Sequence, residues 1–531
     1  MGDFNYPHIN WDTWMTIGSH TSSDYKFVEA MKNCFLFQHV TQPTRYRYDQ
    51  TPNVLDLIFT NEENMVTDLK VLAPLGKSDH GVLSFTLHCY IETDITEVSR
   101  RQYNKGDYDQ LRCNLNIDWE AVLAPFDGDP ETQLKLFNKI VEKEVDTCIP
   151  SYKFRLGSNL RKIPVNAEFR RLNRRKRRLW TRYMESKDRT KYLEYCKFRN
   201  KVRALSRKNQ REFERLIASK VRDEPKLFWN YAKSKLKTTE RIPDLYSPDG
   251  AKVLVTNDVD KANVLSDFFA SVFTQEPNTE FPDVASVTIE HPMTQLDINK
   301  ENVQKVLQNL RSTKSPGPDG IHPHVLKELS TTLSTPLALI FKSSLASGTV
   351  PMSWKAANIS PIFKKGDKRD PSNYRPISLT SVACKVLEKL IRDHLMEYLK
   401  KNNLLSNKQY GFVSGRSVSL QLITVMNDWT RMLDSGQSVD VIYLDFMKAF
   451  DKVPHRRLIH KLKNLEVHSQ ITQWMENFLT GRTQTVVYNG HCSAAKDVNS
   501  GIPQGTVIGP ASFLTFINDL PDNIITYISI C

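Results

Sequence analysis

The 531-residue sequence lacks several features that mark other classes of protein. It has no run of 18 apolar residues, which excludes a typical membrane-spanning helix and a membrane partner. Its eight cysteines are scattered without Cys-x-x-Cys spacing, so neither a zinc site nor a disulfide framework is predicted. The first residues do not resemble a signal peptide. We therefore expect a reduced, intracellular protein, and the sequence does not indicate its oligomeric state.

Adjacent aspartates are also absent from the whole sequence. Metal-dependent phosphoryl transfer to a nucleic-acid end needs two divalent cations held by several carboxylates. The apolar run Val441–Leu444 predicts a buried strand that ends at Asp445, where a carboxylate can hold Mg²⁺ (or Mn²⁺). Taken alone, Asp445 is better explained as the cap of a following helix. This region supplies one carboxylate, and no Asp-Asp pair supplies the others.

Positive charge is concentrated in the middle of the chain. The formal charge is +13, from 73 Lys or Arg and 60 Asp or Glu. Residues 161–237 hold 27 Lys or Arg and 8 Asp or Glu, a balance of +19, so the remainder carries −6. Such a balance favours a polyanionic partner.

The most basic run is followed by regularly spaced aromatic residues. It consists of Arg174, Arg175, Lys176, Arg177 and Arg178. Trp180, Tyr183, Tyr192, Tyr195 and Phe198 come next, and Phe228, Trp229 and Tyr231 lie further along. The aromatic side chains could stack on bases while the cations bind phosphates, or they could form the core of two exposed helices. Both interpretations stay open. The run also resembles a nuclear-localisation patch, so we expect the nucleus and the cytoplasm.

The chain divides by pattern into three regions. Residues 1–95 predict short strands such as Val82–Leu87, and residues 96–290 predict a basic, mainly helical linker. Residues 291–531 return to a mixed α/β pattern. Two apolar stripes at four-residue spacing predict amphipathic helices there. Their members are Leu387, Ile391, Leu395 and Leu399, and Leu422, Met426, Trp429 and Leu433, with a break at Ser435-Gly436.

Three further segments of this region combine turns with functional side chains. Ser315–Ile321 predicts a rigid turn that opens a helix. Lys364, Lys365 and Arg375 are cations in a turn-rich setting suited to a triphosphate, although solvated charged loops are the commoner outcome. In Gly501–Gly505 the glycines allow close backbone approach, and Gln504 could bind a base or template strand. An ordinary turn would look the same.

The N-terminal region contains acidic residues near a histidine. Asp3 and Asn5 stand two apart at a predicted strand end and could bind a phosphate or activate a water. Asp79 lies beside His80, and a buried Asp56 could orient the imidazole, as in a catalytic triad. Taken singly, each motif is better explained as a turn or surface loop.

Five ordered motifs between about residue 300 and 531 resemble the reverse transcriptases of jockey-like non-LTR retrotransposons. They read SPGPDGI, PIFKKGDKRDPSNYRPISL, QYGFVSGRS, VIYLDFMKAFDKVPH and GIPQGTVIGPASFLTFINDLP. The resemblance implies that Asp445 is the first metal-binding carboxylate of the palm and that Phe450 excludes ribonucleotides. It also implies that Lys364 or Lys365, with Arg375, grips the triphosphate. Gln504 and Gly505 would line the nucleotide and template.

The N-terminal motifs, as an ordered set, resemble the C-terminal half of the exonuclease–endonuclease–phosphatase fold, whose apurinic-endonuclease-like members belong to the same elements. This implies that Asp3 and Asn5 handle the attacking water and the phosphate. Asp79 and His80 would form an acid–imidazole pair, with Asp56 behind His80. The implied architecture is a multi-domain α/β protein: half of a four-layer α/β sandwich, a basic helical linker, then fingers and a partial palm.

Two hypotheses follow for the function. The first is an RNA-directed DNA polymerase with a remnant endonuclease, which takes element RNA, target DNA and deoxynucleoside triphosphates. The second is a nucleic-acid-binding remnant without catalysis. We expect no polymerisation, because the Asp-Asp pair is missing, and no strand nicking, because the family's metal-binding Glu is missing.

Overall fold

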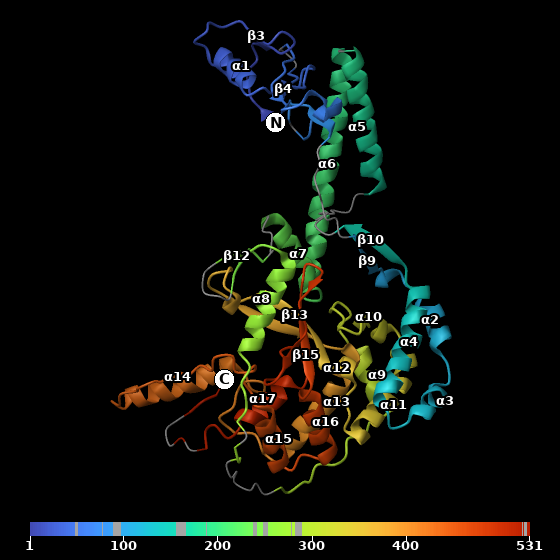
Figure 1. The fold of residues 1–531 in the computed structure, drawn as a ribbon, viewed down its shortest axis with the longest axis vertical. Coiled ribbons are helices and arrows are strands. Elements are labelled where there is room, and N and C mark those ends of the chain that lie inside the picture. Colours follow the sequence, from blue (N-terminus) through green and yellow to red (C-terminus); the bar gives the residue numbers. More distant parts are fainter. Residues whose placement is uncertain are drawn as a thin grey trace. The chain divides into compact units, whose positions relative to one another are not determined.

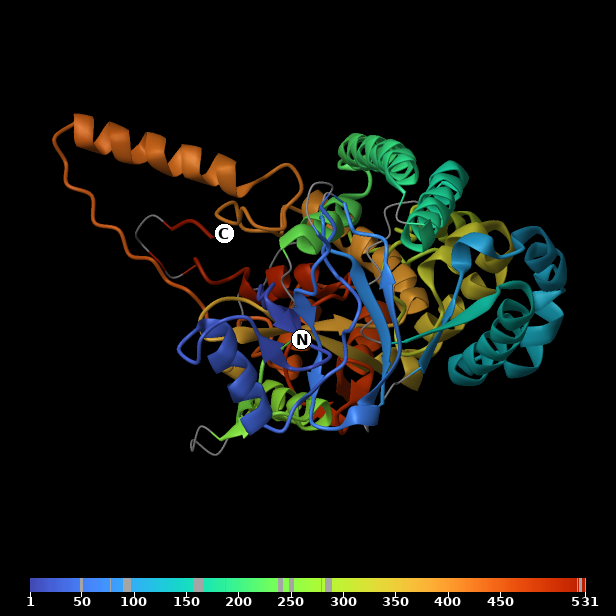
Figure 2. The same ribbon diagram turned by 90° about the horizontal axis from the view of Figure 1, so that it is seen from above.

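The computed structural model describes the chain except residues 48–50, 77, 89–96, 156–165, 187, 237–241, 248–252, 278, 282–288, 523, 525–527 and 531 (Figures 1 and 2). It forms two compact units. The first combines residues 1–98 and 154–240, and the second combines 99–153 and 241–531. Residues of the expected linker, 96–290, therefore contribute to both units. Among the described helices, none is long and apolar enough to cross a membrane.

Short antiparallel strand pairs build the N-terminal part of the first unit. β1 (Gly2–Asp3) pairs with β5 (Asp56–Leu57), and β4 (Phe37–Gln38) pairs with β6 (Phe59–Thr60). The other pairs are β2 (Ile9–Asn10) with β3 (Met15–Thr16) and β7 (Val66–Leu72) with β8 (Val82–Leu87). The short strands predicted here, Val82–Leu87 among them, are confirmed.

Two cores stabilise the first unit. One packs Ile9, Trp11, Val28 and Leu57 beneath α1 (Ser23–Asn33). The other lies between α5 (Ala167–Ser186) and α6 (Arg189–Lys220), which form a long helical hairpin (Figure 1). Asp188 caps α6 by accepting from the Thr190 N–H at 2.9 Å. α7 (Pro225–Leu236) follows, and the short helix η1 (Glu63–Met65) precedes β7.

A five-stranded mixed sheet organises the second unit. Its order is β14 (Tyr374–Leu379), β13 (Ala356–Phe363), β15 (Arg482–Tyr488) and β16 (His491–Cys492), with β17 (Lys496–Val498) also pairing with β15. β13 runs antiparallel to β14 and parallel to β15. The further pairs are β9 (Glu97–Arg101) with β10 (Ser151–Arg155) and β11 (Leu245–Tyr246) with β12 (Leu254–Val255).

Helices supply most of the core of the second unit. They are α2 (Tyr108–Leu115), α3 (Trp119–Leu123), α4 (Pro130–Cys148), α8 (Asp258–Ser271), α9 (Lys300–Gln308), α10 (Pro323–Glu328), α11 (Ser330–Ser347), α12 (Met352–Lys355), α13 (Val382–Lys401), α14 (Val418–Asp434), α15 (His455–Asn464), α16 (Ser469–Leu479) and α17 (Gly509–Ile517). Three short 3-10 helices accompany them: η2 (Tyr103–Lys105), η3 (Ala124–Phe126) and η4 (Pro371–Asn373). α13 confirms the first predicted stripe, because all four side chains of that stripe are fully buried.

The second stripe and the strand after it differ from expectation. α14 forms and ends before Ser435 as predicted, but Leu422, Met426 and Leu433 are exposed. The strand predicted to end at Asp445 is wrong, because residues 437–446 have no regular structure. Ile442 is 85% exposed and Tyr443 83%, and no described strand pairs with this run. A four-residue apolar run forms a strand only where a neighbour supplies hydrogen bonds and covers a face.

The predicted turn at Ser315–Ile321 is confirmed and leads into α10. His322 caps this helix, because its Nδ1 accepts from the His324 N–H at 3.1 Å. Its ring stacks on Tyr103 with the ring centroids 4.0 Å apart. Burial, and secondarily the nearby His324, lowers the pKa of His322 to about 4. The folded protein therefore holds His322 neutral at pH values where the unfolded chain binds a proton.

The stability of the second unit should fall as the pH drops from about 6.5 to about 4 through His322. In this range the unfolded state takes up the proton and the folded state does not, so the free energy of unfolding decreases. After a discount for partial exposure, we expect a contribution of about 1–3 kcal/mol. Urea unfolding at several pH values measures it.

The matched control is His322→Asn, which keeps a capping acceptor but does not titrate. His455, whose pKa is also lowered by burial, is present in both proteins and cancels in the difference. Identical pH profiles for the two proteins would contradict the assignment.

Candidate functional sites

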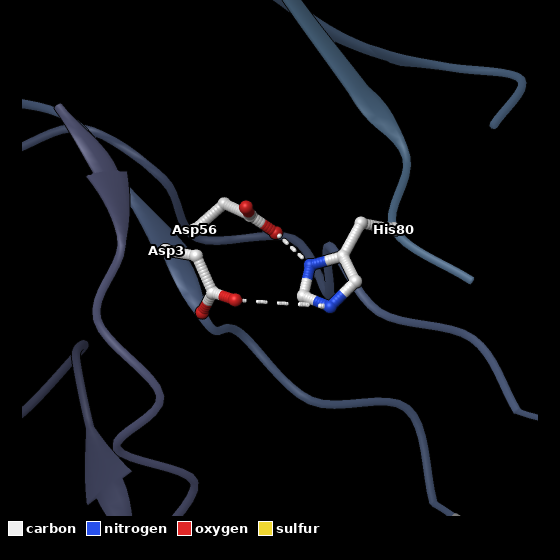
Figure 3. A group of neighbouring side chains, drawn as sticks. All are labelled: Asp3, Asp56 and His80. Carbon is white, nitrogen blue, oxygen red and sulfur yellow. Dashed lines mark hydrogen bonds and ion pairs between the residues drawn. The ribbon is translucent and has the colours of Figure 1, made fainter. Parts of the chain in front are cut away.

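Asp3, Asp56 and His80 converge in the first unit (Figure 3). His80 Nδ1 lies 2.8 Å from Asp56 Oδ2, and His80 Nε2 lies 3.9 Å from Asp3 Oδ2. Asp3 and Asp56 face each other as register partners in β1 and β5. Among the described residues, this is the one group of three or more metal-ligating side chains whose ligand atoms lie within 4.8 Å of one another. The predicted orientation of His80 by Asp56 is present in the geometry.

A buried threonine holds the backbone behind this group. Thr44 Oγ1 accepts from the N–H groups of Leu55 and Asp56 at 3.1 and 3.0 Å, and the Thr44 side chain is fully buried. The Gly81 N–H donates to the Thr44 carbonyl at 2.6 Å. Residues 44–46 therefore join the segment that carries Asp56 to the segment that carries His80.

The Asp79 carboxylate does not join the His80 group. Asp79 Oδ2 accepts from Arg45 Nε at 3.0 Å and from Arg47 Nε at 2.8 Å. The Arg45 hydrogen bond is the main cause that lowers the pKa of Asp79. The sequence suggested an acid–imidazole pair of adjacent residues, but the structure directs Asp79 to the two arginines. Lys77, which begins the same motif, lies outside the described residues.

Asn5 lies just beyond the strand that carries Asp3. Its φ of 55° is left-handed, so strand alternation no longer sets the direction of its side chain. Its N–H donates to Asp3 Oδ1 at 3.2 Å, which closes a local turn. The spacing of two residues between Asp3 and Asn5 therefore produces a local turn, in which the Asn5 N–H holds the Asp3 carboxylate.

In the second unit, the β13–β14 hairpin carries two of the predicted cations. Arg375 pairs in register with Ile362, and the Lys364 N–H donates to the Asn373 carbonyl at 2.8 Å. Lys364 and Arg375 are exposed, and so is Lys365 in the turn. Burial, and then the positive charges of Lys364 and Arg375, lower the pKa of Lys448 against the opposing effect of Asp451.

The loop 501–505 packs against β14. The Ser378 N–H donates to the Gln504 carbonyl at 2.7 Å. A Cβ on Gly505 would stand 2.6 Å from the Ser378 carbonyl oxygen, and the φ of Gly505 is +120°. Glu388 of α13 fixes the other side of the loop, since its carboxylate accepts from the N–H groups of Val507 and Ile508. Glycine is required at 505 by close backbone packing.

Gln504 is held by an aspartate to which the sequence assigned no role. Gln504 Nε2 donates to Asp451 Oδ1 at 2.9 Å. Asp451 is buried, burial raises its pKa, and its Oδ2 has no hydrogen-bond partner among the described residues. Asp451 therefore orients the Gln504 side-chain amide, the group that we expected to contact a base or the template strand.

Phe450 is joined to the same loop through its backbone. Its carbonyl accepts from the Ile502 N–H at 2.8 Å. Its ring stacks on Phe513, with centroids 4.5 Å apart and planes at 21°. The structure thus gathers Phe450, Gln504 and Gly505 beside β14, whereas Asp445 lies exposed in the irregular segment.

The basic run Arg174–Arg178 lies on α5. Its four arginines are exposed, and Lys176 is half-buried, with a pKa lowered first by burial. The aromatic residues beside the run pack on one another: Trp180 and Tyr195 are buried with their ring centroids 5.0 Å apart. For this hairpin the core interpretation is confirmed. In α7, Phe228 and Trp229 are exposed.

Two family models match the chain. Residues 1–84 match the model described as endonuclease-reverse transcriptase, and residues 362–531 match the model described as reverse transcriptase (RNA-dependent DNA polymerase). The chain therefore carries an endonuclease-like and a reverse transcriptase domain, and its homologues are RNA-directed DNA polymerases of non-LTR retrotransposons. The resemblance drawn from the motifs is confirmed, together with a mixed α/β architecture.

Curated relatives align with most of the chain. The RNA-directed DNA polymerase from mobile element jockey of Drosophila funebris is 26% identical over 98% of this chain and 57% of its own length. The probable RNA-directed DNA polymerase from transposon X-element of Drosophila melanogaster is 27% identical over 98% of this chain and 58% of its own length. The probable RNA-directed DNA polymerase from transposon BS of Drosophila melanogaster is 29% identical over 68% of this chain and 40% of its own length. The chain thus spans about half the length of these relatives.

The roles of Asp451 and Lys448 were not predicted from the sequence. Both lie in the motif VIYLDFMKAFDKVPH, which was quoted for Asp445 and Phe450. Asp451 accepts a hydrogen bond from Gln504, which lies 53 positions further along the chain, and the pKa of Lys448 is lowered by burial and then by Lys364 and Arg375. The available signal was a second carboxylate in the same motif, six residues after Asp445.

Proposed function

We propose that the family function of this protein is target-primed reverse transcription, by an RNA-directed DNA polymerase with an endonuclease domain, and that a polypeptide of residues 1–531 keeps binding functions of that process without polymerising DNA. Its substrates would be element RNA, target DNA and deoxynucleoside triphosphates. The observation that carries the proposal is the position of the cations Lys364 and Arg375 on the β13–β14 hairpin, whose Ser378 N–H donates to the Gln504 carbonyl, in the region that matches the reverse transcriptase model. Together with Lys448, we call these cations the cationic cluster. In architectural terms, residues 291–531 would correspond to fingers and an incomplete palm. The N-terminal strands would form half of a four-layer sandwich.

The Asp3, Asp56 and His80 group fits phosphodiester chemistry. Asp56 orients the imidazole through Nδ1 at 2.8 Å, which leaves Nε2 available to hold or move a proton. Asp3, half-exposed beside Nε2, offers a hard oxygen ligand to Mg²⁺ or Mn²⁺. A bound divalent cation would stabilise negative charge on the phosphate. The proposed role of Asp56 is therefore positioning, and that of His80 is proton transfer.

Asp445 does not fit a two-metal centre in this structure. It is exposed, and it belongs to no group of metal-ligating residues among those described. Two cations held about 3.5–4 Å apart need several carboxylates. We therefore derive no step through a metal at Asp445. This observation favours the second hypothesis, a nucleic-acid-binding remnant without catalysis, as the activity of a polypeptide of these 531 residues.

A polypeptide of residues 1–531 should bind a deoxynucleoside triphosphate through the cationic cluster. We expect Lys364→Ala/Arg375→Ala to weaken binding of a fluorescent dATP analogue by at least about 10–100-fold, since the loss of even one charge-assisted hydrogen bond, roughly 1.5–3 kcal/mol, corresponds to that range. Lys448→Ala should weaken it as well. Fluorescence titration measures the dissociation constants.

The matched control is Lys400→Ala/Lys401→Ala, which removes two exposed charges at the end of α13. Its affinity should stay within about twofold of the unmodified protein. If the cluster variant binds as well as this control, or the unmodified protein does not bind, the proposed nucleotide site is wrong.

A further inference from the structure

The end of the α5–α6 hairpin packs on the strand segment that supports His80. The Tyr46 ring meets Trp180 of α5 edge to face, with centroids 5.6 Å apart and an angle of 88°. Both residues are buried, 3% exposed each, and Val71 and Ala73 pack against the same cluster. This contact, which we call the Tyr46–Trp180 joint, makes the hairpin part of the same unit as His80.

The Tyr46–Trp180 joint contacts Asp79, the residue that precedes His80 of the candidate nuclease group. The Tyr46 N–H donates to the Asp79 carbonyl at 2.8 Å, and the flanking Arg45 and Arg47 bind the Asp79 carboxylate. His80 follows directly and bonds to Asp56. The position of the hairpin and the position of the His80 backbone are therefore set by the same short segment.

The hairpin is strongly cationic outside the joint. Residues 167–220 contain 20 Lys or Arg and 6 Asp or Glu, a balance of +14 against +13 for the whole chain. In the aromatic cluster of the hairpin, Trp180 and Tyr195 are buried, and Tyr183, Tyr192 and Phe198 are partly buried against them. Exposed cations without exposed aromatics suit the sugar-phosphate backbone of a duplex better than the bases of a single strand.

The distances allow one duplex to reach both features. Arg174 precedes Trp180 by six residues, which is about 9 Å along a helix at 1.5 Å per residue. One turn of B-DNA is about 34 Å long and presents a phosphate about every 3.4 Å on each strand. Measured along α5, Arg174–Arg178 therefore lie within about 9 Å of the Tyr46–Trp180 joint, which is less than one helical turn of B-DNA.

We propose that the α5–α6 hairpin is a DNA-docking arm of the endonuclease unit, which holds the phosphate backbone of a duplex through Arg174, Arg175, Arg177 and Arg178. The Tyr46–Trp180 joint fixes this arm to the segment behind Asp79 and His80. The inference rests on the proposed endonuclease role of the first unit, and it adds the partner and the surface that binds it.

Fluorescence anisotropy of the full 531-residue chain with a 20-base-pair duplex, in EDTA and at several salt concentrations, tests the arm. Replacing all four arginines by alanine should weaken binding at least tenfold at low salt. It should reduce the log–log salt slope by about 3–4, since each phosphate contact contributes about 0.9. Replacing the same four by lysine should restore most of the affinity.

The matched control removes four exposed lysines of the second unit: Lys300, Lys305, Lys342 and Lys400. Its duplex affinity should stay within about threefold of the unmodified chain. Equal losses in the control and the hairpin variant would overturn the proposal, because they would show a general charge effect. Tighter, arginine-dependent binding of single-stranded RNA of equal length would also overturn it, in favour of an RNA arm.

Cross-linking separates this inference from the proposed function. A duplex that carries photoreactive phosphates should cross-link to peptides from residues 167–186 and from residues 39–81 of the same chain. Cross-links to the hairpin alone would overturn the link to the nuclease group. No step requires cleavage or nucleotide binding, so a chain that fails the dATP test can still pass this one.

Discussion

Replacing Gly505 by alanine should destabilise the second unit by about 2–5 kcal/mol. The residue has a φ of +120°, and an added Cβ would meet the Ser378 carbonyl oxygen at 2.6 Å. Backbone strain of this kind costs about 1–3 kcal/mol, and overpacking against rigid backbone costs a similar amount. β14 cannot move away easily, because it is bonded along its length to β13. Urea unfolding, followed by hydrogen exchange in peptides that contain β14, measures the loss.

Gly415→Ala is the matched control for this substitution. Gly415 also has a positive φ, +84°, but nothing lies within 4 Å of the position that an added Cβ would take. We expect a loss of about 1–2 kcal/mol from backbone conformation alone. Equal losses at both glycines would show that the contact between residue 505 and β14 contributes nothing, and would contradict the close packing of the 501–505 loop on that strand.

The sequence predicted elements whose signal is local. The stripe of α13 is complete within 20 residues and is buried as expected, and the turn at Ser315–Ile321 follows from its prolines and glycines. The placement of Asp56 behind His80 was also anticipated, from the order of motifs that resemble a known fold. These predictions rested on a helical periodicity, on turn-forming residues and on the order of motifs, all of which are visible in the sequence.

Contacts between residues that are far apart in the sequence could not be predicted from local sequence patterns. The Tyr46–Trp180 joint links residues 134 positions apart, and Asp451 meets Gln504 across 53 positions. Asp79 was paired with its neighbour His80 by proximity in sequence, whereas its carboxylate is drawn to Arg45 and Arg47. The run Val441–Leu444 has strand-like composition, but composition does not supply a neighbouring strand.

The apolar residues around Asp445 are exposed for the same reason. Ile442, Tyr443 and Leu444 are each more than 80% exposed, and α14 presents Leu422 and Met426 to solvent. Exposed apolar surface of this kind marks an interaction site or an aggregation hazard. Because Asp445 lies in this exposed, irregular segment, no described strand or helix holds its carboxylate in place for metal binding.

The central proposal is that these 531 residues carry surfaces that bind nucleotide and nucleic acid but do not form a two-metal centre. Primer extension on an RNA template, with purified protein, Mg²⁺ or Mn²⁺ and all four deoxynucleoside triphosphates, tests it most directly. We expect no product above that of the Asp445→Ala variant. Robust DNA synthesis that Asp445→Ala abolishes would contradict the claim, because it would require the exposed segment 437–446 to assemble a complete metal site.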